Sequence, residues 1–513
     1  MSLSRRQFVV ATAVTVPGLA AVGAAPAVDG RPEPGIRIPV TATDDGAALT
    51  AKAARVRPTE RQIAWQRLER TAFVHFGMNT FTGLEHGTGE EEPEAFLPTA
   101  LDTDQWARAL RDGGFKLAIL TVKHHDGFLL YPSRYSRHSV ASSPWQDGRG
   151  NVLRSFADSM RRHGIKVGVY LSPADENQLL TGVYANGSAR SARTIPGLVE
   201  DDDRTPAPSR TFTMEATDYG EVMLNQLYEV LTEYGPIHEV WFDGAEAHLP
   251  PDRTERYDWD SWFALIRALA PQAVIASTGP DVRWVGNENG FAREDEWSVV
   301  PAKDSGQGLA EVTPTHQVPD MGSRSALTKA RATTAHLQWW PAECDVSLRN
   351  GWFHREGQTL KPVDELTDCY FRSVGRNGVL LVNVPPDRRG LFADTDVARL
   401  REFQERLARE MPVDLARGAR VRDAGTRLDL ARPVEVDRIR LAEDIRHGQQ
   451  IEAAVVEART SRGWTEVART GTVGASRILL LPKPVRARSW RVRVLRSRSR
   501  VRLSRFGLYR SRV

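Results

Sequence analysis

Cysteine is scarce in this sequence, and long apolar runs are absent. The only cysteines, Cys344 and Cys369, match neither a disulfide framework nor a zinc-finger spacing, although one bridge between them stays open. No uninterrupted apolar stretch approaches the roughly 20 residues that cross a bilayer, so no membrane span is expected. The chain of 513 residues is long enough for a large domain and an accessory one.

Several catalytic signatures are also missing. The sequence has no Gly-x-Ser-x-Gly elbow and neither cysteine sits in a motif, so acyl transfer is poorly supported. Phosphate-cradling glycine loops are absent, and nothing resembles a nucleic-acid module. We therefore expect no nucleic-acid partner, no cofactor and no metal requirement. The sequence gives no indication of the oligomeric state.

The N-terminus is typical of an export signal. Residues 4–8 (SRRQF) form a twin-arginine pattern, an apolar run covers 9–22, and residues 25–27 (APA) supply a small-x-small cleavage site. An arginine-tipped helix start is the structural alternative. We predict a signal peptide over 1–27 and a disordered leader over 28–57, which is rich in Pro, Gly, Ala and Thr. The protein would then be secreted, periplasmic or on the surface of a bacterium.

The middle of the chain, residues 58–412, repeats one plan of a short apolar strand followed by a polar loop and an amphipathic helix. Such alternation predicts a parallel sheet buried on both faces. With no Gly-x-Gly-x-x-Gly after the first strand, it favours an α/β fold of the (β/α)8 barrel type over a dinucleotide-binding fold. Seven strands are expected at residues 73–76, 115–122, 165–171, 237–242, 273–277, 336–340 and 379–384, the last two closing the barrel.

Residues 413–513 differ in character and predict a small β-sandwich, with short strands separated by turns and little helix pattern. The stretch 481–513 has twelve arginines or lysines and no acidic residue. Because arginine alternates there with apolar residues, a strand with one solvated arginine face is the simpler interpretation. Attraction to an anionic wall polymer or acidic glycan is the alternative.

Polar residues gather where the expected barrel strands end, which is where barrel enzymes place their catalytic groups. Each has an ordinary structural explanation, since an Asp-Gly pair often forms a turn and paired histidines are often structural. Together, two carboxylates among aromatics and histidines suit glycoside cleavage, in which one attacks the anomeric carbon and the other protonates the leaving oxygen.

Specific segments then carry a resemblance to family 29 α-L-fucosidases. The chain is similar to that family's hallmark segments over roughly residues 60–410, and the sandwich resembles its appended domain through 438–445 (RIRLAEDI). The barrel segments are residues 73–77 (FVHFG), 121–128 (TVKHHDGF), 169–173 (VYLSP), 240–244 (VWFDG) and 381–386 (LVNVPP).

The resemblance implies roles for two carboxylates. Asp243, in the Trp-Phe-Asp-Gly segment, would be the nucleophile. Residues 283–288 (RWVGNE) resemble the segment that carries the acid/base in the 1,3/1,4-fucosidase branch, so Glu288 would be the acid/base, with Glu343 in reserve. Their separation of 45 residues (288 − 243) suggests loops after consecutive strands. By contrast, we expect Glu246, Glu294 and Glu296 to be loop-surface charges.

The same resemblance implies a fucose site. It would be lined by His75, Glu85, His124, His125, Tyr170, Arg283, Trp284 and Trp352. Two residues depart from the family pattern, because His86 stands where Glu-Trp-Gly is common and Ala174 stands where tryptophan often follows Ser-Pro. Both departures could alter affinity or the tolerated aglycone.

We therefore expect an exported retaining α-L-fucosidase that removes terminal α-1,3/1,4-linked fucose from fucosylated oligosaccharides or glycoconjugates. The alternatives are a relaxed-specificity fucosidase of the same family and a non-catalytic glycan-binding relative. A further alternative is a metal-dependent hydrolase with His124, His125 and Asp243 as ligands. Adjacent histidines on a strand point to opposite faces, which weighs against this alternative.

Overall fold

The computed structural model describes residues 36–200, 208, 210–249, 255–306, 309–313, 315 and 318–513. The expected signal peptide, 1–27, and the start of the expected leader, 28–35, lie outside these residues. Within the described ranges, no helix combines the length and apolar character that crossing a bilayer requires.

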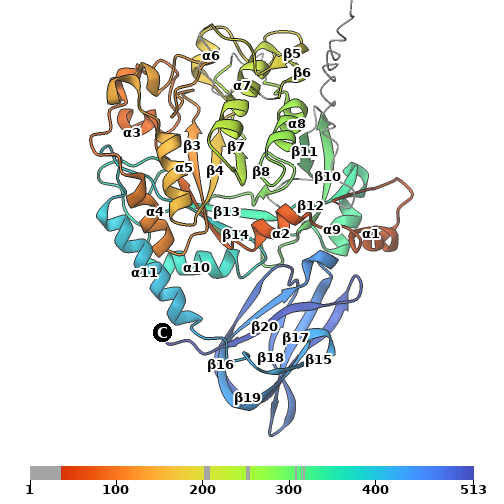
Figure 1. Ribbon diagram of the computed structural model, residues 1–513. Coiled ribbons are helices and arrows are strands. Elements are labelled where there is room, and N and C mark those ends of the chain that lie inside the picture. Colours follow the sequence, from red (N-terminus) through yellow and green to blue (C-terminus); the bar gives the residue numbers. More distant parts are fainter. Residues whose placement is uncertain are drawn as a thin grey trace, which may run out of the picture.

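The larger part of the molecule is a nearly closed barrel of eight parallel strands (Figure 1). Around the barrel the order is β8-β7-β4-β3-β2-β14-β13-β9, so the first barrel strand along the chain, β2, lies beside the last barrel strand, β14. The strands are β2 (Arg70–Val74), β3 (Leu117–Lys123), β4 (Lys166–Leu171), β7 (Glu239–Phe242), β8 (Val274–Ser277), β9 (Arg283–Trp284), β13 (Ala342–Ser347) and β14 (Val379–Asn383). This architecture confirms the predicted (β/α)8-type barrel.

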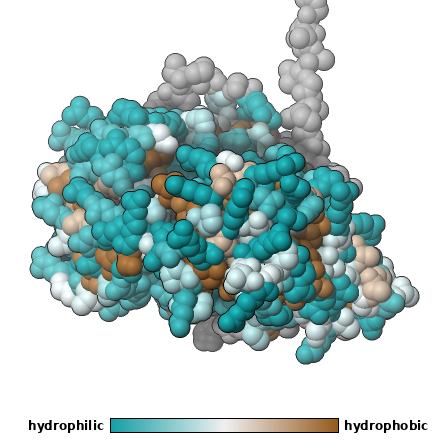
Figure 2. Space-filling view, turned by 90° about the horizontal axis from the view of Figure 1, so that it is seen from below, coloured by the Kyte–Doolittle hydropathy of each residue, from teal (hydrophilic) through white to brown (hydrophobic). Residues whose placement is uncertain are grey.

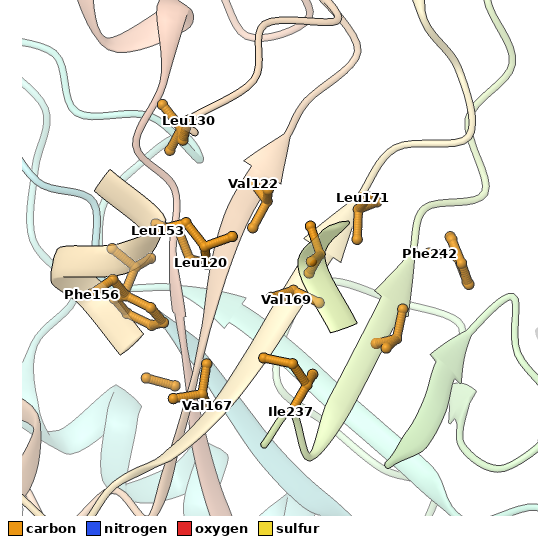
Figure 3. Packing of buried hydrophobic residues seen from close by; sticks show 14 of the residues in the cluster. Leu120, Val122, Leu130, Leu153, Phe156, Val167, Val169, Leu171, Ile237 and Phe242 are labelled. Carbon is orange, nitrogen blue, oxygen red and sulfur yellow. The ribbon is translucent and has the colours of Figure 1, made fainter. Parts of the chain in front are cut away.

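Helices cover the outside of the barrel and bury its apolar strands. Figure 3 shows Leu153 and Phe156 of one such helix, α5, packed near Leu120 of β3 and Val167 of β4. Local signals set the helix ends: Asp102 Oδ1 accepts from Gln105 N at 2.9 Å and so caps α4. The surrounding helices are α2 (Glu60–Gln66), α4 (Thr103–Asp112), α5 (Val152–Arg162), α7 (Asp218–Glu233), α8 (Trp259–Leu269), α10 (Val363–Ser373) and α11 (Asp394–Glu410).

Shorter elements decorate the loops that follow the barrel strands. In Figure 1 these loops lie at the end of the barrel opposite the C-terminal sheet. They include α3 (Met78–Thr82), α6 (Glu176–Leu180) and a hairpin of β5 (Ser191–Ile195) and β6 (Phe212–Ala216).

One expected closing strand of the barrel is in a different sheet. Residues 336–340 contain β12 (His336–Trp339), which pairs antiparallel with β1 (Arg37–Pro39) and β10 (Val299–Gly306). With β11 (Leu309–Val312) these strands form a separate four-stranded sheet. The place that we expected residues 336–340 to take in the barrel is taken by β13, which begins after Pro341, and by the two-residue β9. An apolar run predicts a strand but does not identify its partners, and the prediction for 336–340 was wrong for that reason.

The described part of the expected leader, residues 36–57, is folded rather than disordered. Strand β1 pairs with β12, and helix α1 (Gly46–Ala53) contacts α9 (Arg324–Ala330). Ile36, Ala53 and Val56 are buried there with Leu337 and Trp339. The tertiary pairing orders a segment whose composition alone indicates disorder.

The C-terminal part forms an antiparallel β-structure, as predicted for residues 413–513. It lies below the barrel in Figure 1. Residues 478–481 and 490–494 belong to one long strand, β19, rather than to separate short strands. Trp490 is fully buried in its core. The strands are β15 (Arg420–Arg422), β16 (Arg427–Glu443), β17 (Ile451–Thr460), β18 (Gly463–Thr470), β19 (Arg477–Ser497) and β20 (Leu503–Tyr509).

Exposed arginines of β19, among them Arg486, Arg488 and Arg493, lie on the C-terminal part, at the lower end of the molecule in Figure 1. Seen from below (Figure 2), this end shows hydrophobic residues in small separate patches. Arg491 and Arg493 pair with Glu457 of β17, at 2.6 and 3.2 Å. Part of the arginine face is thus neutralised within the sheet itself.

Candidate active site

A cavity of about 430 Å³ opens where the barrel strands end. It brings together nine of the ten residues that the sequence singled out as catalytic or substrate-binding, from segments more than 250 residues apart in the chain. The expected residues that line it are His75, Glu85, His124, His125, Tyr170, Asp243, Trp284, Glu288 and Trp352. Phe73, His86, Trp241, Gly244, Ser277 and Asp345 complete the lining.

Asp243 directly follows β7 and is held by two hydrogen bonds. Tyr170, near the end of neighbouring β4, donates its hydroxyl to Asp243 Oδ2 at 2.7 Å. The backbone N–H of Ala245 donates to Oδ1 at 3.1 Å, and His125 Nε2 lies 3.9 Å from Oδ2. The side chain remains 30% exposed. The carboxylate is therefore fixed in orientation yet accessible from the cavity.

The three histidines are anchored through one ring nitrogen each. His75 Nδ1 lies 2.9 Å from Asn383 Oδ1, His124 Nδ1 lies 3.3 Å from Asn79 Nδ2, and His125 Nδ1 lies 2.7 Å from Ser172 Oγ. Burial lowers the pKa of His75 to about 3 and that of His125 to about 4, although the charge of Asp243 opposes the shift of His125. Burial also holds the pKa of His124 well below its usual value. All three are neutral near pH 7 and can exchange hydrogen bonds with hydroxyl groups.

This anchoring does not favour the metal-dependent alternative. In the part of the chain that the structure describes, His124, His125 and Asp243 do not converge as a three-ligand group. The two Nδ1 atoms face Asn79 and Ser172, and His125 faces Asp243 at 3.9 Å. A zinc site usually needs three ligands that converge on one point, and among the described residues His124 does not join His125 and Asp243 in such a group.

Glu288 lies after β9 at the mouth of the cavity, where its side chain is solvent-exposed but partly surrounded by protein. Burial raises its pKa, and the negative charge of Asp243 raises it further, while a hydrogen bond with Trp352 opposes the rise. The expectation that the two carboxylates follow consecutive strands was wrong, because β8 lies between β7 and β9 in the chain. Ring closure nevertheless brings both loops to one cavity.

The reserve candidate, Glu343, lies inside the barrel and does not line the cavity. Its Oε2 accepts from Trp241 Nε1 at 2.9 Å. Burial, reinforced by the nearby carboxyl of Glu239, raises its pKa well above the usual value. Glu343 therefore supports the wall beneath the cavity through Trp241, without access to it.

Arg283 also does not reach the cavity, contrary to expectation. Its guanidinium is fully buried and pairs with Glu296, and its Nε donates to Trp340 O at 3.0 Å. Glu296 is equally buried and pairs with Arg293 at 3.0 Å, so it is not the surface charge that its loop context suggested. In β9, Trp284 faces the cavity while its neighbour Arg283 points away, as alternation along a strand requires.

We expect Arg283→Ala to destabilise the protein by about 3 kcal/mol or more, because it leaves Glu296 with one cationic partner in a dry site. The free energy of unfolding in denaturant would measure this. Arg469→Ala, which removes an exposed pair with Glu466, should cost less than about 1 kcal/mol. Unchanged stability together with weaker fucoside binding would instead place Arg283 at the sugar.

Of the six further lining residues, Asp345 and Trp241 make side-chain hydrogen bonds that the sequence reasoning did not anticipate. Asp345 Oδ1 accepts from Trp284 Nε1 at 2.9 Å and so orients that indole. Burial and the proximity of Glu288 raise the pKa of Asp345 well above its usual value. A signal was present: in residues 343–347 (ECDVS), polar residues alternate with apolar ones, the period of a strand with one polar face.

The two departures from the family pattern have different surroundings. His86 lines the cavity and stacks on His125, with ring centroids 4.2 Å apart. A flat ring is thus retained where an aromatic contact was expected to be lost. Ala174 is buried, and its carbonyl accepts from Ser172 Oγ at 2.7 Å. The ring that a tryptophan would supply at this position is therefore absent.

The chain is similar to known α-L-fucosidases. The family model described as "Alpha-L-fucosidase" matches residues 58–410. "Alpha-L-fucosidase 1" of Arabidopsis thaliana is 34% identical over 488 residues, covering 88% of this chain and 87% of that protein.

Solved structures are similar over most of the chain. A candidate α-L-fucosidase from Bacteroides ovatus has a TM-score of 0.79 and 37% identity, covering 93% of this chain and 78% of that one. A family 29 fucosidase from Ruminococcus gnavus, solved in complex with fucose, has a TM-score of 0.70 and 27% identity, covering 94% and 97%.

Proposed function

This chain belongs to the α-L-fucosidase family, glycoside hydrolase family 29, and we propose that it is an exported enzyme that hydrolyses terminal α-1,3/1,4-linked L-fucose with retention of configuration. The observation that carries the proposal is the pairing of two unlike carboxyl groups in one cavity. Asp243 is oriented by Tyr170, and Glu288 has a raised pKa that favours its protonated form. A nucleophile and a proton donor are what retaining hydrolysis requires.

In the first step, an oxygen of the Asp243 carboxylate attacks the anomeric carbon of fucose. The bond from that carbon to the leaving oxygen breaks, and Glu288 donates its proton to this oxygen. The product is a fucosyl ester of Asp243, and Glu288 is left ionised.

In the second step, Glu288 takes a proton from a water molecule, whose oxygen attacks the same carbon and releases Asp243. Two inversions at one carbon give net retention. Retaining enzymes hold their two carboxyl groups about 5–5.5 Å apart, which suits direct attack.

The walls of the cavity suit a deoxy sugar with several hydroxyl groups. The neutral rings of His75, His124 and His125 can bond hydroxyls without a charge that would need desolvation. Trp241 and Trp352 supply flat apolar faces. Glu85 accepts from the backbone N–H of Trp352 at 3.1 Å and pairs with Arg355, which places a carboxylate at the rim for another hydroxyl.

A second hollow of about 700 Å³ shares Glu85, Glu288 and Trp352 with the cavity and extends past Arg349 and Arg355. It provides room for further sugar units next to the scissile bond, as a branched glycan requires. This observation, with the resemblance of residues 283–288, supports the 1,3/1,4 preference over relaxed specificity. The twin-arginine pattern at residues 4–8 supports export.

The direct test gives the purified protein an aryl α-L-fucoside and a Lewis-type trisaccharide side by side, and follows free fucose. We expect release mainly from the trisaccharide, because its additional sugars can occupy the second hollow. Fast release from the aryl fucoside alone would overturn the linkage preference and favour a relaxed fucosidase. Binding of either compound without release would favour a glycan-binding protein.

A further inference from the structure

A group of metal-ligating side chains joins His86 of the cavity wall to two residues, Glu176 and His248, that the proposed hydrolysis does not use. His86, Glu176 and His248 each present one ligand atom, and the three atoms lie within 4.8 Å of one another. Glu176 Oε1 is 2.8 Å from His248 Nδ1 and 3.4 Å from His86 Nε2. We propose that these side chains bind one divalent transition metal ion of the zinc class.

The donor set selects the class of ion. Two imidazoles and one carboxylate suit zinc and its neighbours, whereas calcium and magnesium prefer oxygen ligands throughout. A tetrahedral zinc ion with ligands at about 2.0–2.1 Å spaces them about 3.3 Å apart. The 3.4 Å separation fits this spacing, and modest side-chain movement adjusts the remaining two.

Glu176 is the fixed member of the group. It is 4% exposed, and its backbone N–H donates to His125 O at 2.8 Å. Its carboxylate also accepts from the backbone N–H of His248 at 3.0 Å, which brings the loop after β7 against α6. Two of the three ligand groups thus already lie against each other.

His86 supplies the independent observation. Its Nε2 is buried and makes no hydrogen bond, although it faces a carboxylate oxygen at 3.4 Å. Its ring is held in place by stacking on His125. A buried, unsatisfied imidazole nitrogen costs free energy, which a coordinated ion would recover.

Metal binding would replace the hydrogen bond between His248 and Glu176. His248 Nδ1 gives up its proton while Nε2 takes one from solvent, so the ring stays neutral, and Nδ1 and the carboxylate then share the ion. Because His248 follows Asp243 by five residues, the ion would tie the nucleophile's loop to α6.

The test is calorimetric titration of the chelator-treated, tag-free protein with zinc chloride. We expect one ion per chain, and at least about tenfold weaker binding in Glu176→Gln and in His248→Ala. His248 has a largely exposed side chain, so its removal should leave the fold intact. His447→Ala, which removes an exposed histidine near Asp444 in the sandwich, is the matched control and should bind like the parent.

Cobalt(II) gives a second readout independent of hydrolysis. Its visible absorption should show a low-coordinate site in the parent and lose that signature in Glu176→Gln. Failure to bind one ion per chain, or binding that neither variant weakens, would overturn the proposal. Since ion binding is measured directly, either outcome leaves the fucosidase proposal untouched.

Discussion

Replacing Asp243 with alanine should abolish fucoside hydrolysis, with a loss in kcat of about 10,000-fold or more. The variant removes the atom that forms the bond to the anomeric carbon, while Tyr170 and the histidines remain to bind the sugar. Release of fucose from the preferred substrate would measure the loss. Because the substitution shortens a partly exposed loop residue, we expect little change in stability.

Azide provides the decisive complement to this variant. In the space left by the carboxylate, azide can attack the anomeric carbon from the same face, so Asp243→Ala should form β-fucosyl azide. Glu246→Ala removes an exposed carboxylate three residues away and should retain parental activity. Full activity in Asp243→Ala, or rescue that gives the α-azide, would refute the assignment of the nucleophile.

Replacing Glu288 with alanine should reduce hydrolysis of the glycan by about 100- to 10,000-fold, the usual contribution of a general acid. Aryl fucosides with good leaving groups need little protonation, so their first step should suffer far less. The ratio of kcat/KM for the two substrates therefore measures the role of Glu288. Equal loss on both would contradict it.

The pH profile provides a second readout for the same residue. Glu288 must be protonated for the first step, so kcat/KM for the glycan should fall as the pH rises through its pKa. Burial and the charge of Asp243 raise that pKa, which extends the active range toward higher pH. Glu343→Gln is the matched control: it keeps an acceptor for Trp241, and neither the substrate ratio nor the alkaline limb should change.

Site residues whose positions depend on local sequence were predicted to lie where the structure places them. Asp243 follows a buried strand of four residues, three of them apolar, and the end of such a strand in a parallel barrel faces the catalytic side. The histidines after β2 and β3 and Tyr170 at the end of β4 follow the same rule, and all of them line the cavity. In each case the position of the residue at or after a strand end determined that its side chain lines the cavity.

Residues whose positions depend on distant partners were not predicted correctly from the sequence. Arg283 and Trp284 are adjacent, yet only the fold shows that one pairs with buried Glu296 and the other faces the sugar cavity. Asp345 and Glu343 lie on β13. The sequence reasoning did not identify this strand, because it assigned the barrel strand to the preceding segment, which is β12. Their raised pKa values arise from burial among groups that are far away in the chain.

The sequence by itself determined the alternation of strands and helices, hence the barrel, and the strand ends at which catalytic groups stand. These features follow from hydrophobic periodicity and capping, which act over a few residues. The tertiary structure alone decided which strands close the barrel, which carboxyls are buried, and that His86, Glu176 and His248 meet. Strand partners, desolvation and convergence of ligands are long-range properties, because they depend on which segments the closing of the ring brings together.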